Sequence, residues 1–353
     1  MATDDRIVTV SFSRAHTDLC DRLGLDVAIV QAPIGSATTA ELAAAVANAG
    51  GLGMLSISWR STGQIESLLN ATRELTDRPV GVNVVLEWPQ RERVALALEK
   101  GIKVISTFWG DPGAYVSLVH DAGAVLLHTV GSKEEARRAV AAGVDVLVAQ
   151  GVEAGGHVTG SVPLRELLAS IIDACPGVPV VAAGGLANGA DIATQLAGGA
   201  SGVWMGTRFV CASEANAADV YKARIVASGA ADTVVTSVFD QGWPDAPHRV
   251  LVNSTIRLSN GKSGVDGPRA GDGDIIATSP GGRFVHRYAF ALPTRELVGD
   301  LEAMALYAGT STERIHDVQP AGRLIERLVQ ETEQAIRSTS APRPAPAQDS
   351  QNR

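Results

Sequence analysis

Short apolar runs alternate with longer segments of mixed polarity from Val27 to Ala227. A short run rich in valine and isoleucine is typical of a buried parallel strand, whereas apolar residues three or four apart are typical of a helix packed on one face. The pattern predicts eight strands, at Val27–Val30, Leu52–Leu55, Val80–Val85, Val104–Phe108, Ala124–His128, Val146–Ala149, Val180–Ala183 and Gly202–Met205. It predicts eight helices, at Thr39–Ala49, Gly63–Leu75, Gln90–Glu99, Ala114–Asp121, Ser132–Ala142, Leu164–Ala174, Ala190–Leu196 and Glu214–Ala227.

Eight strands, each followed by a helix, predict a closed (β/α)₈ barrel, the TIM barrel. The competing architecture, an open doubly wound sheet, usually has fewer strands and carries a glycine-rich dinucleotide fingerprint after its first strand. Here the first predicted strand ends in Gln31-Ala32-Pro33, which is not that fingerprint. We therefore expect an α/β chain with a closed barrel.

The alternation stops after Ala227, and this divides the chain. We assign residues 1–229 to the barrel and residues 230–310, which have few helix or strand signals, to a small inserted lid. Residues 311–337 contain an apolar stripe, Leu324, Ile325, Leu328 and Val329, which predicts a helix that returns to the barrel. The composition of residues 338–353, rich in Pro, Ala, Ser and Gln, predicts a disordered tail.

Charge and cysteine content narrow the function classes. A formal net charge of −8 with no basic stripe argues against a nucleic-acid or membrane partner. The three cysteines form no Cys-x-x-Cys pair, and metal-ligand spacings such as His-x-x-x-His are absent, so we expect no disulfide framework and no metal. The first residues lack the apolar core of a secretory signal, and no apolar run reaches membrane-spanning length, so we expect a cytoplasmic protein.

The stretch Gln150 to Gly160 is the strongest candidate for chemistry. It follows a predicted buried strand and presents His157 from a loop that has glycine at four positions: Gly151, Gly155, Gly156 and Gly160. Glycine lets the backbone approach a flat ligand closely, because it has no Cβ. A histidine at the carboxyl end of a barrel strand is suited to proton transfer near neutral pH. The alternative interpretation is a loop histidine bonded to a carbonyl.

Two neighbouring strands end in glycine corners. Gly184 and Gly185 follow the seventh strand, and Trp204-Met205-Gly206-Thr207 ends the eighth. Exposed backbone N–H groups, a helix start and the Thr207 hydroxyl are suited to a phosphate, and barrels bind phosphate at this place. Across the barrel mouth, Ala32 and Pro33 offer a flat apolar ledge, and Asn83 and Gln150 offer amides that match the polar atoms of a flavin ring. FMN fits this arrangement.

Together these motifs resemble nitronate monooxygenases, formerly called 2-nitropropane dioxygenases. The resemblance is carried by Gln31-Ala32-Pro33, Gly81-Val82-Asn83, Gln150 to His157, Ala183-Gly184-Gly185 and Trp204 to Phe209, and more loosely by Gly242-Trp243-Pro244. It implies an FMN-dependent TIM barrel in which His157 is the base beside the flavin. The cofactor would be held by Asn83, Gln150, Gly155, Gly185 and the run Trp204, Met205, Gly206 and Thr207. His128 stands where some relatives carry lysine, so we also place it at the flavin.

The resemblance implies oxidation of an alkyl nitronate, such as propionate 3-nitronate, or of a nitroalkane by dioxygen, without NAD(P)H. The same loop occurs in NADH:quinone reductases and in flavin-dependent enoyl-acyl-carrier-protein reductases, which remain alternatives. A phosphosugar or nucleotide barrel enzyme and a catalytically silent flavin-binding protein are further alternatives. The expected partners are a small-molecule substrate and dioxygen, and the sequence is compatible with a homodimer.

Overall fold

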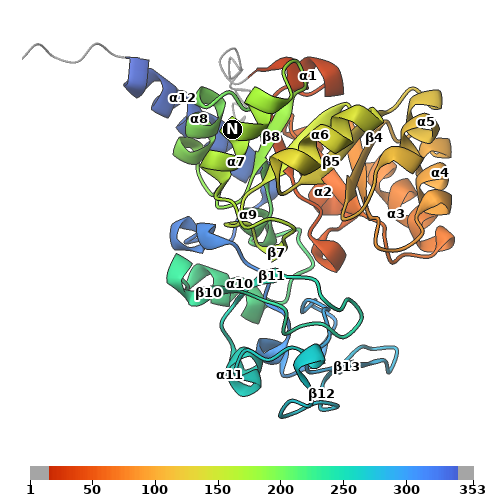
Figure 1. Cartoon of the computed structure of the whole chain (residues 1–353), viewed down its shortest axis with the longest axis vertical. Coiled ribbons are helices and arrows are strands. Elements are labelled where there is room, and N and C mark those ends of the chain that lie inside the picture. Colours follow the sequence, from red (N-terminus) through yellow and green to blue (C-terminus); the bar gives the residue numbers. More distant parts are fainter. Residues whose placement is uncertain (1–15, 341–353) are drawn as a thin grey trace, which may run out of the picture.

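The computed structural model describes residues 16–340 and has a closed barrel of eight parallel strands at its centre (Figure 1). Its strands are β1 (Ile29–Gln31), β2 (Leu52–Ser56), β3 (Val80–Val85), β4 (Val104–Phe108), β5 (Val125–Val130), β6 (Val146–Gln150), β8 (Val180–Ala183) and β9 (Gly202–Met205). Successive strands pair in parallel, and β9 closes the barrel on β1, with Val30 opposite Trp204. The predicted TIM barrel is confirmed, and the predicted strand ends differ from the observed ones by two residues at most.

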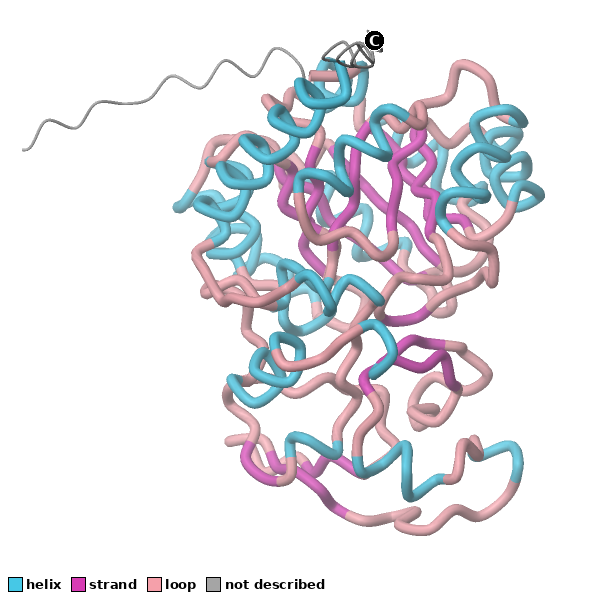
Figure 2. Tube along the Cα trace, turned by 90° about the vertical axis from the view of Figure 1, so that its left-hand side faces the viewer, coloured by secondary structure: helices cyan, strands magenta, loops and turns pink. Residues whose placement is uncertain are grey.

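Helices surround the barrel, as Figure 2 shows. Seven of them follow the strands as predicted: α2 (Ala40–Asn48), α3 (Thr62–Leu75), α4 (Arg91–Glu99), α5 (Gly113–Asp121), α6 (Lys133–Ala142), α7 (Leu164–Ala174) and α8 (Gly189–Ala197). Several end at a glycine in the left-handed conformation, such as Gly143 with φ 104°, where a Cβ would be strained.

The eighth helix of the ring comes from the end of the chain. Helix α12 (Ala321–Ser340) packs against α8 and α2 and buries Leu324, Ile325, Leu328 and Val329 in the core between barrel and helices. The helix predicted at Glu214–Ala227 is confirmed only in its second half, as α10 (Asp219–Val226), and a further short helix, α9 (Thr207–Val210), directly follows β9. Tyr221 and Ile225 of α10 pack with Leu251 and Leu306 of the lid, because the place beside α8 is already filled by α12.

The side chains of the strands alternate between two cores. In β5, Leu127 packs inside the barrel with Val104 and Val146, whereas Leu126 and Val130 pack outside against the helices. Helix α1 (Asp18–Leu23), which the sequence analysis did not predict, adds Leu19 and Leu23 to the inner core and covers one end of the barrel. The inner core therefore leaves the opposite end, where the strands have their carboxyl termini, for a ligand.

The lid lies against that carboxyl end and has more regular structure than we predicted (Figure 1). It contains β10 (Thr233–Thr236), β11 (His248–Leu251), α11 (Ser254–Ser259), β12 (Ile275–Thr278), β13 (Phe284–His286) and β14 (Val298–Gly299). Strands β12, β13 and β14 form one small antiparallel sheet. Short 3-10 turns lie at Gly35–Ala37, Ala230–Asp232, Gly264–Asp266, Leu301–Ala303 and Thr310–Arg314.

A second small sheet joins the lid to the barrel. Strand β7 (Gly156–His157), in the loop after β6, pairs with β11 so that His157 lies opposite His248, and β11 also pairs with β10. The loop that carries the predicted base is therefore an edge strand of a lid sheet. The pairing of β7 with β11 fixes the backbone of His157, and the imidazole takes no part in it.

Two expectations concern the ends of the chain. Helix α12 continues to Ser340, so residues 338–340, which we assigned to a disordered tail, are helical. The other residues assigned to the tail, 341–353, and the N-terminal residues 1–15 lie outside the part that the structure describes.

Between residues 16 and 340, no helix combines the length and the apolarity that a membrane crossing requires. In that same range, no three His, Cys, Asp or Glu side chains gather as a metal site would need.

Candidate active site

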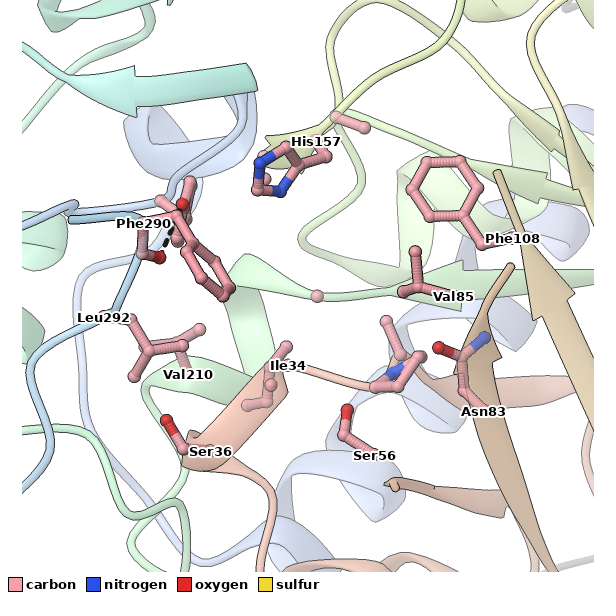
Figure 3. A pocket seen from close by; sticks show the side chains of 18 of the residues that line it. Ile34, Ser36, Ser56, Asn83, Val85, Phe108, His157, Val210, Phe290 and Leu292 are labelled. Carbon is pink, nitrogen blue, oxygen red and sulfur yellow. Dashed lines mark hydrogen bonds between the residues drawn. The ribbon is translucent and has the colours of Figure 1, made fainter. Parts of the chain in front are cut away.

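A cavity of about 750 Å³ lies between the carboxyl ends of the barrel strands and the lid. In Figure 3, His157 and Phe290 border it on one side, and Ser56 and Asn83 border it on the other. Nearly all the predicted site residues line it together: Ala32, Pro33, Asn83, Gln150, Gly155, His157, Gly184, Gly185, Trp204, Met205, Gly206 and Thr207. Residues from strands far apart in the sequence thus meet in one place.

His128 is the exception, and its predicted place at the flavin is wrong. Strand β5 continues to Val130, so His128 lies within the strand, on the face that packs against the helices, and Thr129 lines the cavity instead. The Thr107 hydroxyl donates to the Leu127 carbonyl at 3.1 Å, so it accepts from His128 Nδ1 at 2.8 Å. Burial lowers the pKa of His128 to about 4, which keeps this side chain neutral at neutral pH.

Aromatic rings hold His157. Its imidazole stacks on the indole of Trp243, with centroids 4.0 Å apart and planes 23° apart. Trp109 meets it edge to face at 6.2 Å, and the rings of His248 and Tyr307 lie at 5.2 and 5.5 Å. Trp243 comes from the lid and is 2% exposed, so the imidazole of the barrel loop is oriented by a residue of the inserted segment.

His157 has an imidazole that is free to take a proton. Neither ring nitrogen has a hydrogen-bond partner among residues 16–340, and Nε2 is buried. Burial, and then the proximity of His248, place the pKa of His157 well below 6.5. His248 cannot supply a proton easily, because its Nδ1 bonds the Ala246 carbonyl and its Nε2 accepts the Phe239 N–H. At neutral pH the site therefore contains an unpaired neutral base.

The two glycine corners have the geometry of an anion cradle. Gly184 and Gly185 have φ of 120° and 70°, and a Cβ on Gly185 would come within 3.1 Å of both Glu153 and Thr310. Among the described residues, the N–H groups of Gly185 and Gly206 have no acceptor. The Thr207 oxygen accepts the Gly309 N–H at 3.0 Å, which leaves the hydroxyl hydrogen to donate into the cavity. These donors are suited to a phosphate.

The Arg208 side chain does not take part in this cradle. It is fully buried, does not line the cavity, and pairs with Asp317 at 2.7 Å.

The two amides on the cavity wall keep acceptor atoms for a ligand. Asn83 Nδ2 donates to the backbone and side-chain oxygens of Ser106 at 3.3 and 3.2 Å, so Asn83 Oδ1 remains available (Figure 3). Gln150 Nε2 donates to the His157 carbonyl at 3.1 Å, and Gln150 Oε1 is buried without a donor. A buried oxygen without a partner is costly, so these amides are suited to a ligand N–H.

Close backbone approach fixes the loop between β6 and β7. A Cβ on Gly155 would lie 2.5 Å from the Gly309 nitrogen, so only glycine lets the loop pack on this segment. The Thr310 N–H donates to the Glu153 carbonyl at 3.0 Å. The Glu153 carboxylate accepts the Leu164 N–H at the start of α7, so it stabilises a helix end and does not face the ligand.

Several residues of the cavity were not predicted. Trp59 and Arg60 follow β2 by only a few positions, and extending the search beyond Ser56 would have found them. The lid side chains had no local signal, because only the tertiary structure brings them over the barrel: Gln241, Arg283, Phe284, His286, Phe290, Leu292 and Tyr307.

Comparison with known proteins supports the family resemblance that the sequence motifs indicated. The sequence profile described as nitronate monooxygenase matches residues 16–93 and 89–331. A relative in Mycobacterium tuberculosis, named (3aS,4S,5R,7aS)-5-hydroxy-7a-methyl-1-oxo-octahydro-1H-indene-4-carboxyl-CoA dehydrogenase, is 36% identical over 252 residues, which is 70% of each chain.

Solved structures share the whole architecture. FabK from Thermotoga maritima superposes with a TM-score of 0.76 at 28% identity, over 92% of this chain and 98% of that one. Nitroalkane oxidase from Streptomyces ansochromogenes superposes with a TM-score of 0.73 at 30% identity, over 91% of this chain and 99% of that one. The barrel and the lid are thus both parts of a known arrangement.

Proposed function

The chain belongs to the nitronate monooxygenase family, and we propose that it uses FMN and dioxygen to oxidise alkyl nitronates or nitroalkanes. The products would be a carbonyl compound and nitrite, and propionate 3-nitronate is one candidate substrate. One observation carries the proposal: a neutral, unpaired imidazole, His157, lines the same cavity as two glycine corners with free N–H groups.

The residues of the cavity fit FMN. The N–H groups of Gly185 and Gly206 and the Thr207 hydroxyl would hold the phosphate. Asn83 Oδ1 and Gln150 Oε1 would accept from the N–H of the flavin ring, which would satisfy the buried Gln150 oxygen. When bound, FMN supplies the electron acceptor for the substrate, and dioxygen is the second substrate.

The protein itself would supply proton transfer and orientation. A ring nitrogen of His157 would take the proton from the carbon next to the nitro group, and the electron pair would remain on the resulting nitronate. Stacking on Trp243 holds the imidazole in place while this occurs. Phe108 and Phe290 line the cavity and, with the lid, would limit the access of water to the reacting atoms.

A second candidate function is oxidation or reduction next to a thioester carbonyl. It is favoured by the relative named as a carboxyl-CoA dehydrogenase and by the predominantly apolar and aromatic walls of a cavity of about 750 Å³. A thioester also makes the neighbouring C–H acidic, so His157 would have the same role. The enoyl-acyl-carrier-protein reductase and NADH:quinone reductase alternatives differ from nitronate oxidation because they would use NADH as the reductant.

Anaerobic mixing separates nitronate oxidation from the NADH-dependent alternatives. The FMN-loaded protein is mixed without oxygen either with propyl nitronate or with NADH, and flavin absorbance is followed. We expect bleaching by the nitronate and, after air is admitted, nitrite. Rapid bleaching by NADH, with none by the nitronate, would reject nitronate oxidation in favour of a reductase.

A further inference from the structure

The cavity has an unusual charge distribution for this chain. The protein has a formal net charge of −8, yet no Asp or Glu is among the described residues that line the cavity. The charged side chains that line it are Arg60 from the barrel and Arg283 from the lid. An acid-free cavity with arginines favours an anionic ligand over a neutral or cationic one.

Arg60 is a cation without a counter-ion. It lies in the loop between β2 and α3, is half-buried, and donates through Nε to the Ser56 carbonyl at 3.0 Å. No carboxylate among residues 16–340 forms an ion pair with it. Burial lowers the pKa of Arg60 without an opposing carboxylate, although a guanidinium remains protonated in proteins. Such a cation is stabilised when a ligand brings the missing negative charge.

The surroundings of Arg60 indicate where that ligand would lie. Trp59, which is 46% exposed, and Gln64 line the same cavity. Arg60 and Gln64 also line a shallow hollow along the first turns of α3, with Ser61, Gly63, Ser67 and Leu68. The two hollows meet at Arg60, so a ligand that extends from the cavity toward α3 passes the guanidinium.

We propose that Arg60 binds an anionic group at the far end of the substrate, away from the carbon that His157 would deprotonate. The proposal rests on the proposed function for the reacting end. The shared chemistry is a terminal oxyanion, which a guanidinium binds through two parallel N–H bonds. It can come from the carboxylate of a nitro acid or from a phosphate of a coenzyme A thioester. Arg283, on the exposed turn before β13, adds positive charge from the lid.

The first test compares two nitronates of equal carbon chain, with and without a carboxylate. Wild type and Arg60→Gln are assayed with propionate 3-nitronate and propyl nitronate. We expect kcat/KM for propionate 3-nitronate to fall about tenfold or more, mainly through KM, and kcat/KM for propyl nitronate to change less than twofold. Arg73→Gln is the matched control, because Arg73 lies on α3 and does not line the cavity.

The second test measures binding with dioxygen excluded, so that the second substrate is missing and the reaction is not completed. Calorimetric titration of FMN-loaded wild type and Arg60→Gln with 3-nitropropionate and with coenzyme A identifies the source of the anion. Weaker binding of either compound by the variant supports the proposal and names that source. Unchanged binding of both, or a variant that has lost FMN and slows both nitronates equally, would overturn it. A wild type that oxidises no nitronate would reject the proposed function, while the binding test would still judge Arg60.

Discussion

The imidazole of His157 lies on the indole of Trp243, with ring centroids 4.0 Å apart and planes 23° apart. The two residues come from different parts of the fold: His157 is in β7, and Trp243 follows β10 in the lid. Gly242, at φ 100°, precedes the indole, and a Cβ there would lie 2.5 Å from the Phe290 ring. The lid therefore holds the indole tightly enough to orient the base.

Removing the indole should impair proton transfer more than binding. In Trp243→Leu we expect kcat for a neutral nitroalkane to fall about three- to tenfold, the equivalent of one aromatic stacking contact. Turnover of the preformed nitronate should be unchanged, because it needs no proton removal. Trp88→Leu is the control, since Trp88 packs on Trp243 at 5.1 Å and does not line the cavity. Equal effects of the two variants would remove the special role of Trp243.

Replacing the base itself tests the same step more severely. His157→Asn should lower the turnover of neutral nitroalkane by about 10²- to 10⁴-fold, the usual contribution of a general base. Turnover of preformed nitronate should fall only a few-fold. Steady-state assays with nitroethane and with ethyl nitronate measure both. If the two substrates lost activity in equal proportion, His157 would not be the base.

The pH profile of activity should lack the inflection that an unperturbed histidine would cause. Burial holds the pKa of His157 well below 6.5, so the imidazole is neutral at neutral pH. We expect kcat/KM for nitroethane, measured between pH 5.5 and 7.5, to show no inflection near the ordinary histidine value of about 6.5. An inflection at about 6.5, the value of an unperturbed histidine, would show that the imidazole is more solvated than the structure indicates.

His128 gives a prediction about stability. Its folded pKa is about 4, below the unfolded value of 6.5, so the unfolded chain takes up the proton first as pH falls. Stability from this group is complete above pH 6.5 and is lost as pH falls toward 4, with a loss of about 2 kcal/mol by pH 5. Urea unfolding at pH 7.5 and 5.0 should show a smaller pH dependence for His128→Gln than for wild type. The exposed His316→Gln should leave it unchanged; an equal effect of both variants would reject the assignment.

The glycine corner can be tested against a matched glycine elsewhere. Gly185 and Gly177 both have positive φ, 70° and 80°, but Gly177 lies between α7 and β8 and has nothing within 4 Å of an added Cβ. Gly185→Ala should weaken FMN binding about tenfold through backbone strain at the cradle. Gly177→Ala has similar backbone strain and should bind FMN like wild type. Fluorescence titration with FMN measures both, and equal affinities would place the phosphate elsewhere.

The barrel was predictable because its signals are local. Apolar runs such as Val80–Val85 and glycine stops such as Gly143 determine strand and helix ends over a few residues. The position of His128 was not predictable in the same way, since a difference of one residue in a strand moves a side chain to the opposite face. Strand β5 ends two residues later than predicted, so Thr129 takes the place expected for His128.

The lid and the eighth helix depend on contacts between distant segments. Segment 214–227 has a helical pattern, but α12 occupies the place beside α8 and α2, and α10 packs with the lid instead. Strands β12, β13 and β14 are only two to four residues long, so they have no clear sequence pattern. For the same reason, neither the stacking of Trp243 on His157 nor the unpaired state of Arg60 could be derived from sequence.

The most direct test is the absorption spectrum of the purified protein after incubation with FMN and removal of free flavin. We expect a yellow protein with one FMN per chain, and loss of most of that colour in Gly185→Ala under the same treatment. A wild-type protein that stays colourless and takes up no FMN would show that the cavity beside His157 is not a flavin site.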